Sequence, residues 1–96
     1  MYVRLTEIVI KPNTFDEMLE YAETKVSPSL AEIPGMLEVK VVQTSENKFT
    51  VIGEYENSLS ADAAAEQIQT VFGGMTNIFA GPPNVSAGNV IWTFSK

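Results

Sequence analysis

Few residues of this chain could do chemistry. Its 96 residues include no histidine and no cysteine, one arginine (Arg4) and one tryptophan (Trp92). This composition excludes an imidazole base, a thiol nucleophile, a Ser-His-Asp triad and cysteine-based zinc or iron–sulfur sites. The remaining side chains are better suited to binding a ligand than to reacting with one. The guanidinium of Arg4 can bind a carboxylate or a phenolate through two hydrogen bonds, and aromatic side chains can form the wall of a site for a planar ligand.

Six residues are candidates for lining a ligand cavity, because each offers an aromatic ring or a polar group. They are Arg4, Tyr55, Phe72, Asn77, Phe79 and Trp92. A simpler interpretation stays open for each type: aromatic residues pack the core, and an arginine in a strand pairs with a glutamate across the sheet. The catalytic residues cannot be named from the sequence.

Four carboxylates lie close together in one segment, at Asp16, Glu17, Glu20 and Glu23. Carboxylates three residues apart share a helix face, and without histidine only a Ca²⁺ or Mg²⁺ site is conceivable. Charged residues normally occupy the outward face of a helix, however, so we predict a solvated face and no metal.

The chain carries 12 acidic and 6 basic residues, a formal net charge of -6. Nucleic-acid binding needs a basic surface, so we expect no nucleic-acid partner. Glu7 interrupts the apolar core that a signal peptide would need, and no apolar run approaches the ~20 residues of a membrane helix. We expect one cytoplasmic domain over residues 1–96 and no membrane association.

Hydrophobic patterning predicts the elements that must position these residues. Residues 2–10 are rich in β-branched residues and predict a strand. Apolar residues then recur every three or four positions, which predicts a helix from Asn13 or Thr14. Pro28 should kink this helix, or restart it with Ser27 as cap, and Pro34-Gly35 should end it.

Two strand-like runs follow, 36–44 and 49–56, and form a hairpin. A three-residue loop at 46–48 would pair Lys40 with Glu54 and Val42 with Ile52 on one face. A two-residue loop shifts the register by one residue and loses the Lys40–Glu54 ion pair. We therefore predict the three-residue loop.

A second helix should begin with Ser58 or Ser60 as cap, present an alanine-rich apolar stripe, and end at Gly73-Gly74. The last run, 90–94, predicts a C-terminal strand. The order β-α-β-β-α-β is that of an α+β, ferredoxin-like fold with two helices on one face of the sheet. The other face would carry Val42, Ile52 and either Ile8 and Ile10 or Val9. A free face this apolar predicts a homodimer in which two sheets pack face to face.

These features together resemble a known family. A strand, a helix ending in Ile33-Pro34-Gly35-Met36, a strand hairpin and an alanine-rich helix before a final strand resemble the dimeric α+β barrel proteins, most closely the antibiotic biosynthesis monooxygenase-like group. The resemblance covers essentially the whole chain and implies dimerisation through the sheets. Some members are cofactor-independent monooxygenases of quinol-like aromatics, with a pocket of tryptophan, asparagine, tyrosine and arginine. Others degrade haem held by an axial histidine, which this chain lacks.

The resemblance thus implies a cofactor-independent oxygenase of a small aromatic, quinol-like substrate, with no cofactor. Such chemistry needs neither cysteine nor histidine, because the substrate supplies the electron-rich carbanion while the protein desolvates and orients it. A non-catalytic homodimer that binds a small ligand, or serves as an interaction module, stays open as the alternative. A cavity with an inward polar group would favour the enzyme.

Overall fold

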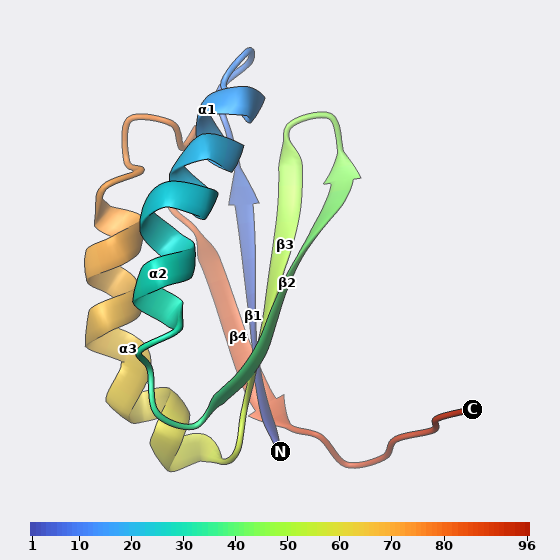
Figure 1. Ribbon diagram of the computed structural model, residues 1–96. Helices are drawn as coiled ribbons and strands as arrows, with labels where there is room; N and C mark the ends of the chain where they lie inside the picture. Colours follow the sequence, from blue (N-terminus) through green and yellow to red (C-terminus); the bar gives the residue numbers. More distant parts are fainter.

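A computed structural model describes all 96 residues. Helices cover one face of a four-stranded antiparallel sheet, and the opposite face carries no helix (Figure 1). The elements are β1 (Tyr2–Val9), α1 (Phe15–Tyr21), η1 (Ala22–Val26), α2 (Ser27–Leu30), β2 (Met36–Ser45), β3 (Lys48–Tyr55), α3 (Ser58–Gly73) and β4 (Asn84–Asn89). The sheet order is β2-β3-β1-β4. The predicted ferredoxin-like fold is therefore confirmed.

The first helical segment is one continuous rod of three parts. The α-helix α1 passes into the π-helical turn η1, which passes into α2 with Pro28 in its first turn. Because proline has no N–H to donate to the preceding turn, the helix cannot keep its ordinary hydrogen bonding there, and the wider π turn precedes it. The expected restart with Ser27 as cap is wrong, because Val26 and Ser27 both have helical backbone angles and neither side chain caps a helix.

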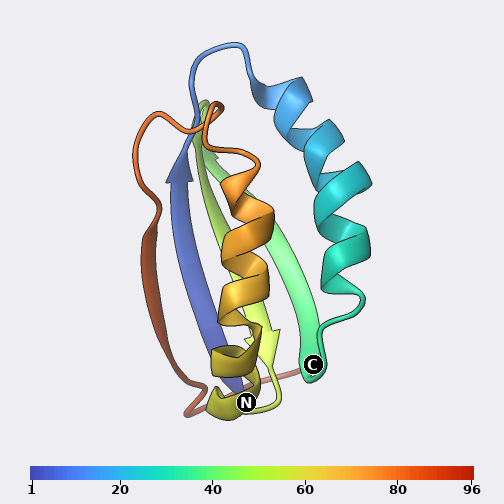
Figure 2. The same ribbon diagram turned by 90° about the vertical axis from the view of Figure 1, so that its left-hand side faces the viewer.

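The second helix, α3, is capped by Asn57, whose side-chain oxygen accepts a hydrogen bond from the Ser60 N–H at 2.8 Å. The expected cap, Ser58 or Ser60, is wrong by one to three residues. At the other end Gly74 has right-handed helical geometry. A Cβ there would collide with the Tyr21 ring, whose hydroxyl donates to the Val71 carbonyl at 2.8 Å. Gly74 therefore allows the two helical segments to approach, and they lie side by side over the sheet (Figure 2).

The β2–β3 hairpin has a different register from the predicted one. Its turn contains only Glu46 and Asn47, with a bulge between Gln43 and Ser45, so Lys40 lies opposite Ile52. Lys40 instead contacts Glu38 of its own strand at 3.1 Å. The predicted ion pair is exposed and worth at most about 1 kcal/mol, too little to set a register. A shift of two residues keeps every side chain on the expected face.

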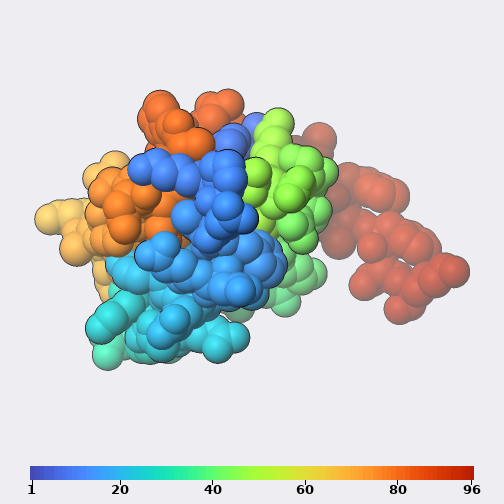
Figure 3. Space-filling view, turned by 90° about the horizontal axis from the view of Figure 1, so that it is seen from above, coloured from blue at the N-terminus to red at the C-terminus, as the bar shows by residue number.

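The C-terminal strand also lies elsewhere. The polar segment Asn84–Asn89 pairs with β1, from Glu7↔Asn84 to Tyr2↔Asn89. The apolar run at 90–94 is extended and unpaired beyond the hydrogen bond from the Val90 N–H to the Met1 carbonyl, at 2.9 Å. Since β1 begins at Tyr2, it offers Ile91 no partner in this sheet. The segment Ile91–Lys96, here called the tail, projects away from the body on the side opposite the helices (Figures 1 and 3).

Side chains on the sheet alternate between two faces. Ile8 and Ile10 of the β1 region point toward the helices and are buried, so placing them on the free face is wrong. The free face carries Leu5, Val9 and Val42, which are exposed, and the partly exposed Ile52. This half-apolar surface is here called the open face.

The buried core consists of two separate clusters. One gathers Ile8, Ile10, Met18, Phe49, Met75 and Ile78. The other gathers Ile33, Tyr55, Ala61 and Ala64. Along β1 and β3 the clusters occupy opposite ends of the inner face, and Arg4, Thr6 and Gly53, which lie between them, belong to neither. The space between the two clusters is where a ligand site can form.

Candidate functional site

The inner pocket lies between the two core clusters and between the sheet and the helices. Its volume is about 110 Å³, and 15 of its 18 lining residues are hydrophobic. The sheet contributes Arg4, Thr6, Val39, Val41 and Gly53, the middle positions of β1, β2 and β3. An empty apolar cavity of about 150 Å³ can bind benzene, so the inner pocket suits little more than a single ring.

A second, more open pocket of about 500 Å³ adjoins the first, between α3, β4 and the segment that joins them. We call it the outer pocket. Arg4, Thr6, Ile68, Phe72 and Phe79 line both pockets. Typical small-molecule sites occupy about 300–1,000 Å³, so the outer pocket can take the rest of a ligand that has one ring in the inner pocket.

Arg4 is the only cation in the wall of these pockets, and it has no carboxylate partner. The two ion pairs of the chain join Lys40 to Glu38 and Lys48 to Glu7. The Arg4 guanidinium donates a long hydrogen bond of 3.3 Å to the Ala61 carbonyl and lies 5.7 Å from the centre of the Tyr55 ring. The alternative in which Arg4 pairs with a glutamate is therefore not what the structure shows. A half-buried guanidinium without a counter-ion is suited to bind an anion.

Tyr55 is 1% exposed and forms the end of the inner pocket beside Arg4. Burial raises the pKa of Tyr55, whereas the charge of Arg4 and its hydrogen bonding act in the opposite direction. The phenol is therefore neutral near pH 7 and can act as a hydrogen-bond donor. The Tyr55 ring lies over Gly53, whose missing side chain leaves part of the pocket empty.

The structure brings four of the six predicted cavity residues together. Arg4, Tyr55, Phe72 and Phe79 line the inner pocket. Asn77 lines a shallow hollow outside it, between α1, η1 and the end of α3. Trp92 lies in the tail, 78% exposed and outside both pockets.

Sequence reasoning missed the buried Thr6 and the valines of β2. The signal was available for Thr6, because Tyr2, Arg4, Thr6 and Ile8 alternate along one strand and so must share a face. The same signal was available for Val39 and Val41, which alternate with Glu38 and Lys40 along β2 and so share the apolar face.

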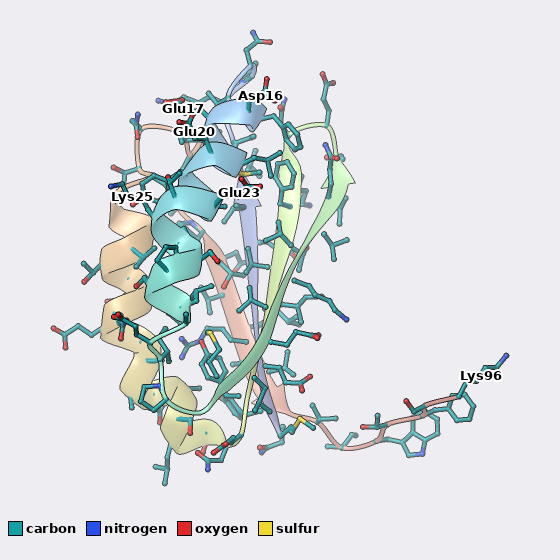
Figure 4. The ribbon with its side chains drawn as sticks, in the orientation of Figure 1. Asp16, Glu17, Glu20, Glu23, Lys25 and Lys96 are labelled. Carbon is teal, nitrogen blue, oxygen red and sulfur yellow. The ribbon has the colours of Figure 1, made fainter.

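The acidic residues of the first helical segment lie on its outward surface (Figure 4). Glu17 and Glu20 border the same shallow hollow as Asn77, together with Lys25. No group of three or more carboxylates in the chain converges as a metal site would require. No helix is long and apolar enough to cross a membrane.

Comparison with solved structures supports the fold. A protein from Nitrosomonas europaea that is described as an antibiotic biosynthesis monooxygenase matches with a TM-score of 0.79 at 18% identity, over 96% of this chain and 100% of that one. One from Caulobacter crescentus matches with a TM-score of 0.80 at 15% identity, over 95% and 90%. A MhuD variant with two manganese protoporphyrin IX molecules per active site matches with a TM-score of 0.80 at 14% identity, over 100% of both chains.

These identities are low, so the likeness of structure shows the fold alone. No curated protein sequence matches the chain significantly. The sequence model of one family, antibiotic biosynthesis monooxygenase, matches residues 1–67, which include β1, the first helical segment, the hairpin and the first half of α3. The chain therefore belongs to the antibiotic biosynthesis monooxygenase family.

Proposed function

We propose that this protein is a homodimeric, cofactor-independent oxygenase of small hydroxylated aromatic compounds of the quinol type. One observation carries the proposal. The half-buried guanidinium of Arg4, without a carboxylate partner, lies in the wall shared by the inner and outer pockets. An apolar pocket with one cation suits an aromatic ligand that carries one ionisable oxygen.

Arg4 would act on the hydroxyl group of such a substrate. A cation in a largely apolar site favours the ionised form of a bound phenol and lowers its pKa. The ionised ring is electron-rich and can reduce molecular oxygen directly. In the balanced reaction a ring C–H and the hydroxyl both become carbonyls, one oxygen atom of O₂ enters the quinone, and the other leaves as water with the two hydrogens. The substrate loses four electrons and O₂ gains four.

The protein would contribute to this reaction by positioning the substrate in an apolar environment. The inner pocket would hold the reacting ring among apolar side chains, which reduces the contact of the ring with water. Tyr55 and Thr6 supply hydroxyl groups in the same wall. No imidazole or thiol is needed, because the substrate itself provides the electrons.

A second function is favoured by a specific observation. Arg4 and Tyr55 are the only titratable groups that line the inner pocket, and the pKa of Tyr55 is raised, so the pocket offers no base that works near pH 7. A non-catalytic homodimer that binds a small acidic aromatic would have the same pocket.

We do not propose haem for this site. The MhuD variant binds manganese protoporphyrin IX, but this chain has no histidine to serve as an axial ligand.

The homodimer is proposed from the open face. Leu5, Val9 and Val42 are 39%, 44% and 43% exposed on a surface that no helix covers. Sheets commonly bury such faces against one another about 10 Å apart, and closed twofold dimers are the commonest assembly. A second copy placed in this way leaves the helices and both pockets outside the contact.

The test uses 1-naphthol and 1-methoxynaphthalene, two ligands of similar shape that differ in the ionisable hydroxyl. Oxygen uptake and incorporation of ¹⁸O from ¹⁸O₂ are followed with the parent protein, Arg4→Met and Arg4→Lys. We expect uptake with 1-naphthol only, lost in Arg4→Met and partly kept in Arg4→Lys. Tight binding of 1-naphthol without oxygen uptake would favour the non-catalytic function. Equal oxidation by Arg4→Met would overturn the role of Arg4.

A further inference from the structure

Thr6, in the middle of β1, has a buried hydroxyl group without a hydrogen-bond partner in the chain. The residue is only 5% exposed. None of the side-chain hydrogen bonds of the chain involves Thr6. Five other threonines each donate to a nearby backbone carbonyl. Because buried polar groups normally find a partner, the unpartnered hydroxyl of Thr6 needs an explanation.

The free hydroxyl of Thr6 faces the two pockets. Thr6 lines both the inner and the outer pocket. No side-chain oxygen or nitrogen of the chain is both fully inaccessible and unpartnered, so the Thr6 oxygen keeps some accessible surface. Its neighbours across the sheet are Val51 of β3 and Val85 of β4, which offer no polar side chain. The accessible side of the oxygen is therefore the pocket side, where a ligand can reach it.

Arg4 is the neighbouring residue on the same face of β1. Of the 18 residues that line the inner pocket, only Arg4, Thr6 and Gly53 are not hydrophobic. Residues two apart in a strand share a face and lie roughly 7 Å from each other. The pocket wall therefore presents one cation and one free hydroxyl at neighbouring positions of a single strand, among apolar contacts.

We propose that Thr6 is a specificity-determining residue, which binds a second oxygen of the ligand across the aromatic ring from the oxygen held by Arg4. A hydroxyl group can both donate and accept, so this second oxygen belongs to a carbonyl or a hydroxyl group. The preferred ligand is then a phenol with an oxygen-bearing group across the ring, and a phenol with an alkyl group there binds less well. The inference rests on the role given to Arg4 in the function proposed above.

The outer pocket has room for the group that carries the second oxygen. The inner pocket suits little more than one ring, and Thr6 lies in the wall that both pockets share. The outer pocket is less apolar, with 5 hydrophobic residues among 11, and its polar side chains include Gln69 and Thr76. A polar substituent that extends past Thr6 therefore enters a space that suits it better than the inner pocket does.

Two para-substituted phenols test the role of Thr6. 4-Hydroxyacetophenone carries a carbonyl oxygen across the ring, whereas 4-isopropylphenol has a group of similar shape without oxygen. The acetyl group makes the ring a poor electron donor, so binding can be measured by calorimetry without oxidation. Because this group also makes the phenol more acidic, the quantity to compare is the change that Thr6→Val causes in the affinity for each ligand.

Valine has nearly the shape of threonine and lacks the hydroxyl. We expect Thr6→Val to weaken binding of 4-hydroxyacetophenone roughly five- to tenfold, the worth of one hydrogen bond, and binding of 4-isopropylphenol less than about twofold. Thr6→Ser keeps the hydroxyl and should keep most of the preference. Equal losses of both ligands in Thr6→Val would overturn the role of Thr6 while leaving the Arg4 site standing.

Stability gives a second readout, which separates ligand binding from a structural role. Since the Thr6 hydroxyl has no partner in the free protein, Thr6→Val should unfold at the same denaturant concentration as the parent protein or at a higher one. A lower midpoint would show that the hydroxyl is already bonded within the fold and is not free for a ligand, against the inference.

Arg4→Met separates the inference from the proposed function. We expect this variant to bind both phenols more weakly than the parent protein does. If Thr6→Val discriminates between the phenols but Arg4→Met binds both as well as the parent protein, the role of Arg4 is wrong and the second oxygen alone is recognised. A parent protein that binds neither phenol would overturn both proposals.

Discussion

The two faces of the sheet are built from the same strands and differ in what covers them. On the inner face Ile10, Phe49 and Tyr55 are each 1% exposed beneath the helices. On the open face the alternate residues Leu5, Val9 and Val42 are equally apolar and remain exposed. Alternation along a strand decides which residues share a face, but it does not decide which face is buried. The inner face carries the folding energy and the pocket, and the open face is left for a partner.

The largest effect is expected in the inner core. Phe49→Ala removes a buried ring that stacks against Phe15 with ring centres 5.8 Å apart. We expect the free energy of unfolding to fall by about 3–5 kcal/mol in denaturant titration. The exposed substitution Leu59→Ala is the control and should change it by less than about 0.5 kcal/mol. A similar small effect for both would mean that Phe49 is not packed as described.

On the open face, Ile52→Glu tests assembly rather than folding. A glutamate at a buried contact between two sheets is left unpaired, which costs about 3 kcal/mol or more. We expect a folded monomer by analytical ultracentrifugation, whereas Ile52→Leu remains dimeric. If Ile52→Glu is still a dimer of unchanged stability, the open face is not the interface.

Gly53→Ala separates stability from binding on the inner face. The added Cβ would lie 3.5 Å from the Tyr55 ring, an ordinary contact, and alanine is less costly than glycine in a strand. We expect the free energy of unfolding to rise by about 0.5 kcal/mol. Because the methyl group fills part of the inner pocket, affinity for 1-naphthol should fall in calorimetry. Loss of stability together with unchanged affinity would contradict the position given to Gly53.

The smallest effect concerns pH. Burial raises the pKa of Tyr55 above its ordinary value of 10.0. Stability from the buried neutral phenol is fully present below pH 10 and falls as pH rises above it, because the unfolded chain ionises first. We expect Tyr55→Phe to show a shallower loss of stability between pH 9 and 11 than the parent protein. Equal slopes would show that Tyr55 ionises as easily in the fold as outside it.

Most of the fold follows from local patterns, and the exceptions have physical causes. Helix periodicity, Pro28 and the Pro34-Gly35 turn locate the first helical segment, and Gly35 indeed has a positive φ of 78°. The prediction of the hairpin register relied on an exposed Lys40–Glu54 ion pair, which is too weak to set the register. The final strand was assigned to 90–94 from its composition, whereas pairing with β1 selects Asn84–Asn89. A strand needs a partner as well as a suitable sequence. The sequence alone does not show that β1 pairs with residues 84–89 and offers no partner to Ile91.

The site was less predictable than the fold. Arg4 was identifiable because it is the only arginine, but its lack of a carboxylate partner depends on contacts between distant segments. Phe72 and Phe79 reach the pocket because α3 and the following turn pack across the sheet. Trp92 was predicted to be a pocket residue from its type alone, and only the structure shows that it lies in the exposed tail.

The division of the core has a consequence for how such a protein can change over evolutionary time. Because the two clusters hold the ends of the sheet, the positions between them, among them Thr6, Val39 and Gly53, can be replaced without removing a member of either cluster. A lineage could therefore acquire a new ligand through a few substitutions at the centre while the chain still folds. A library restricted to these central positions should yield many folded proteins with altered ligand preference.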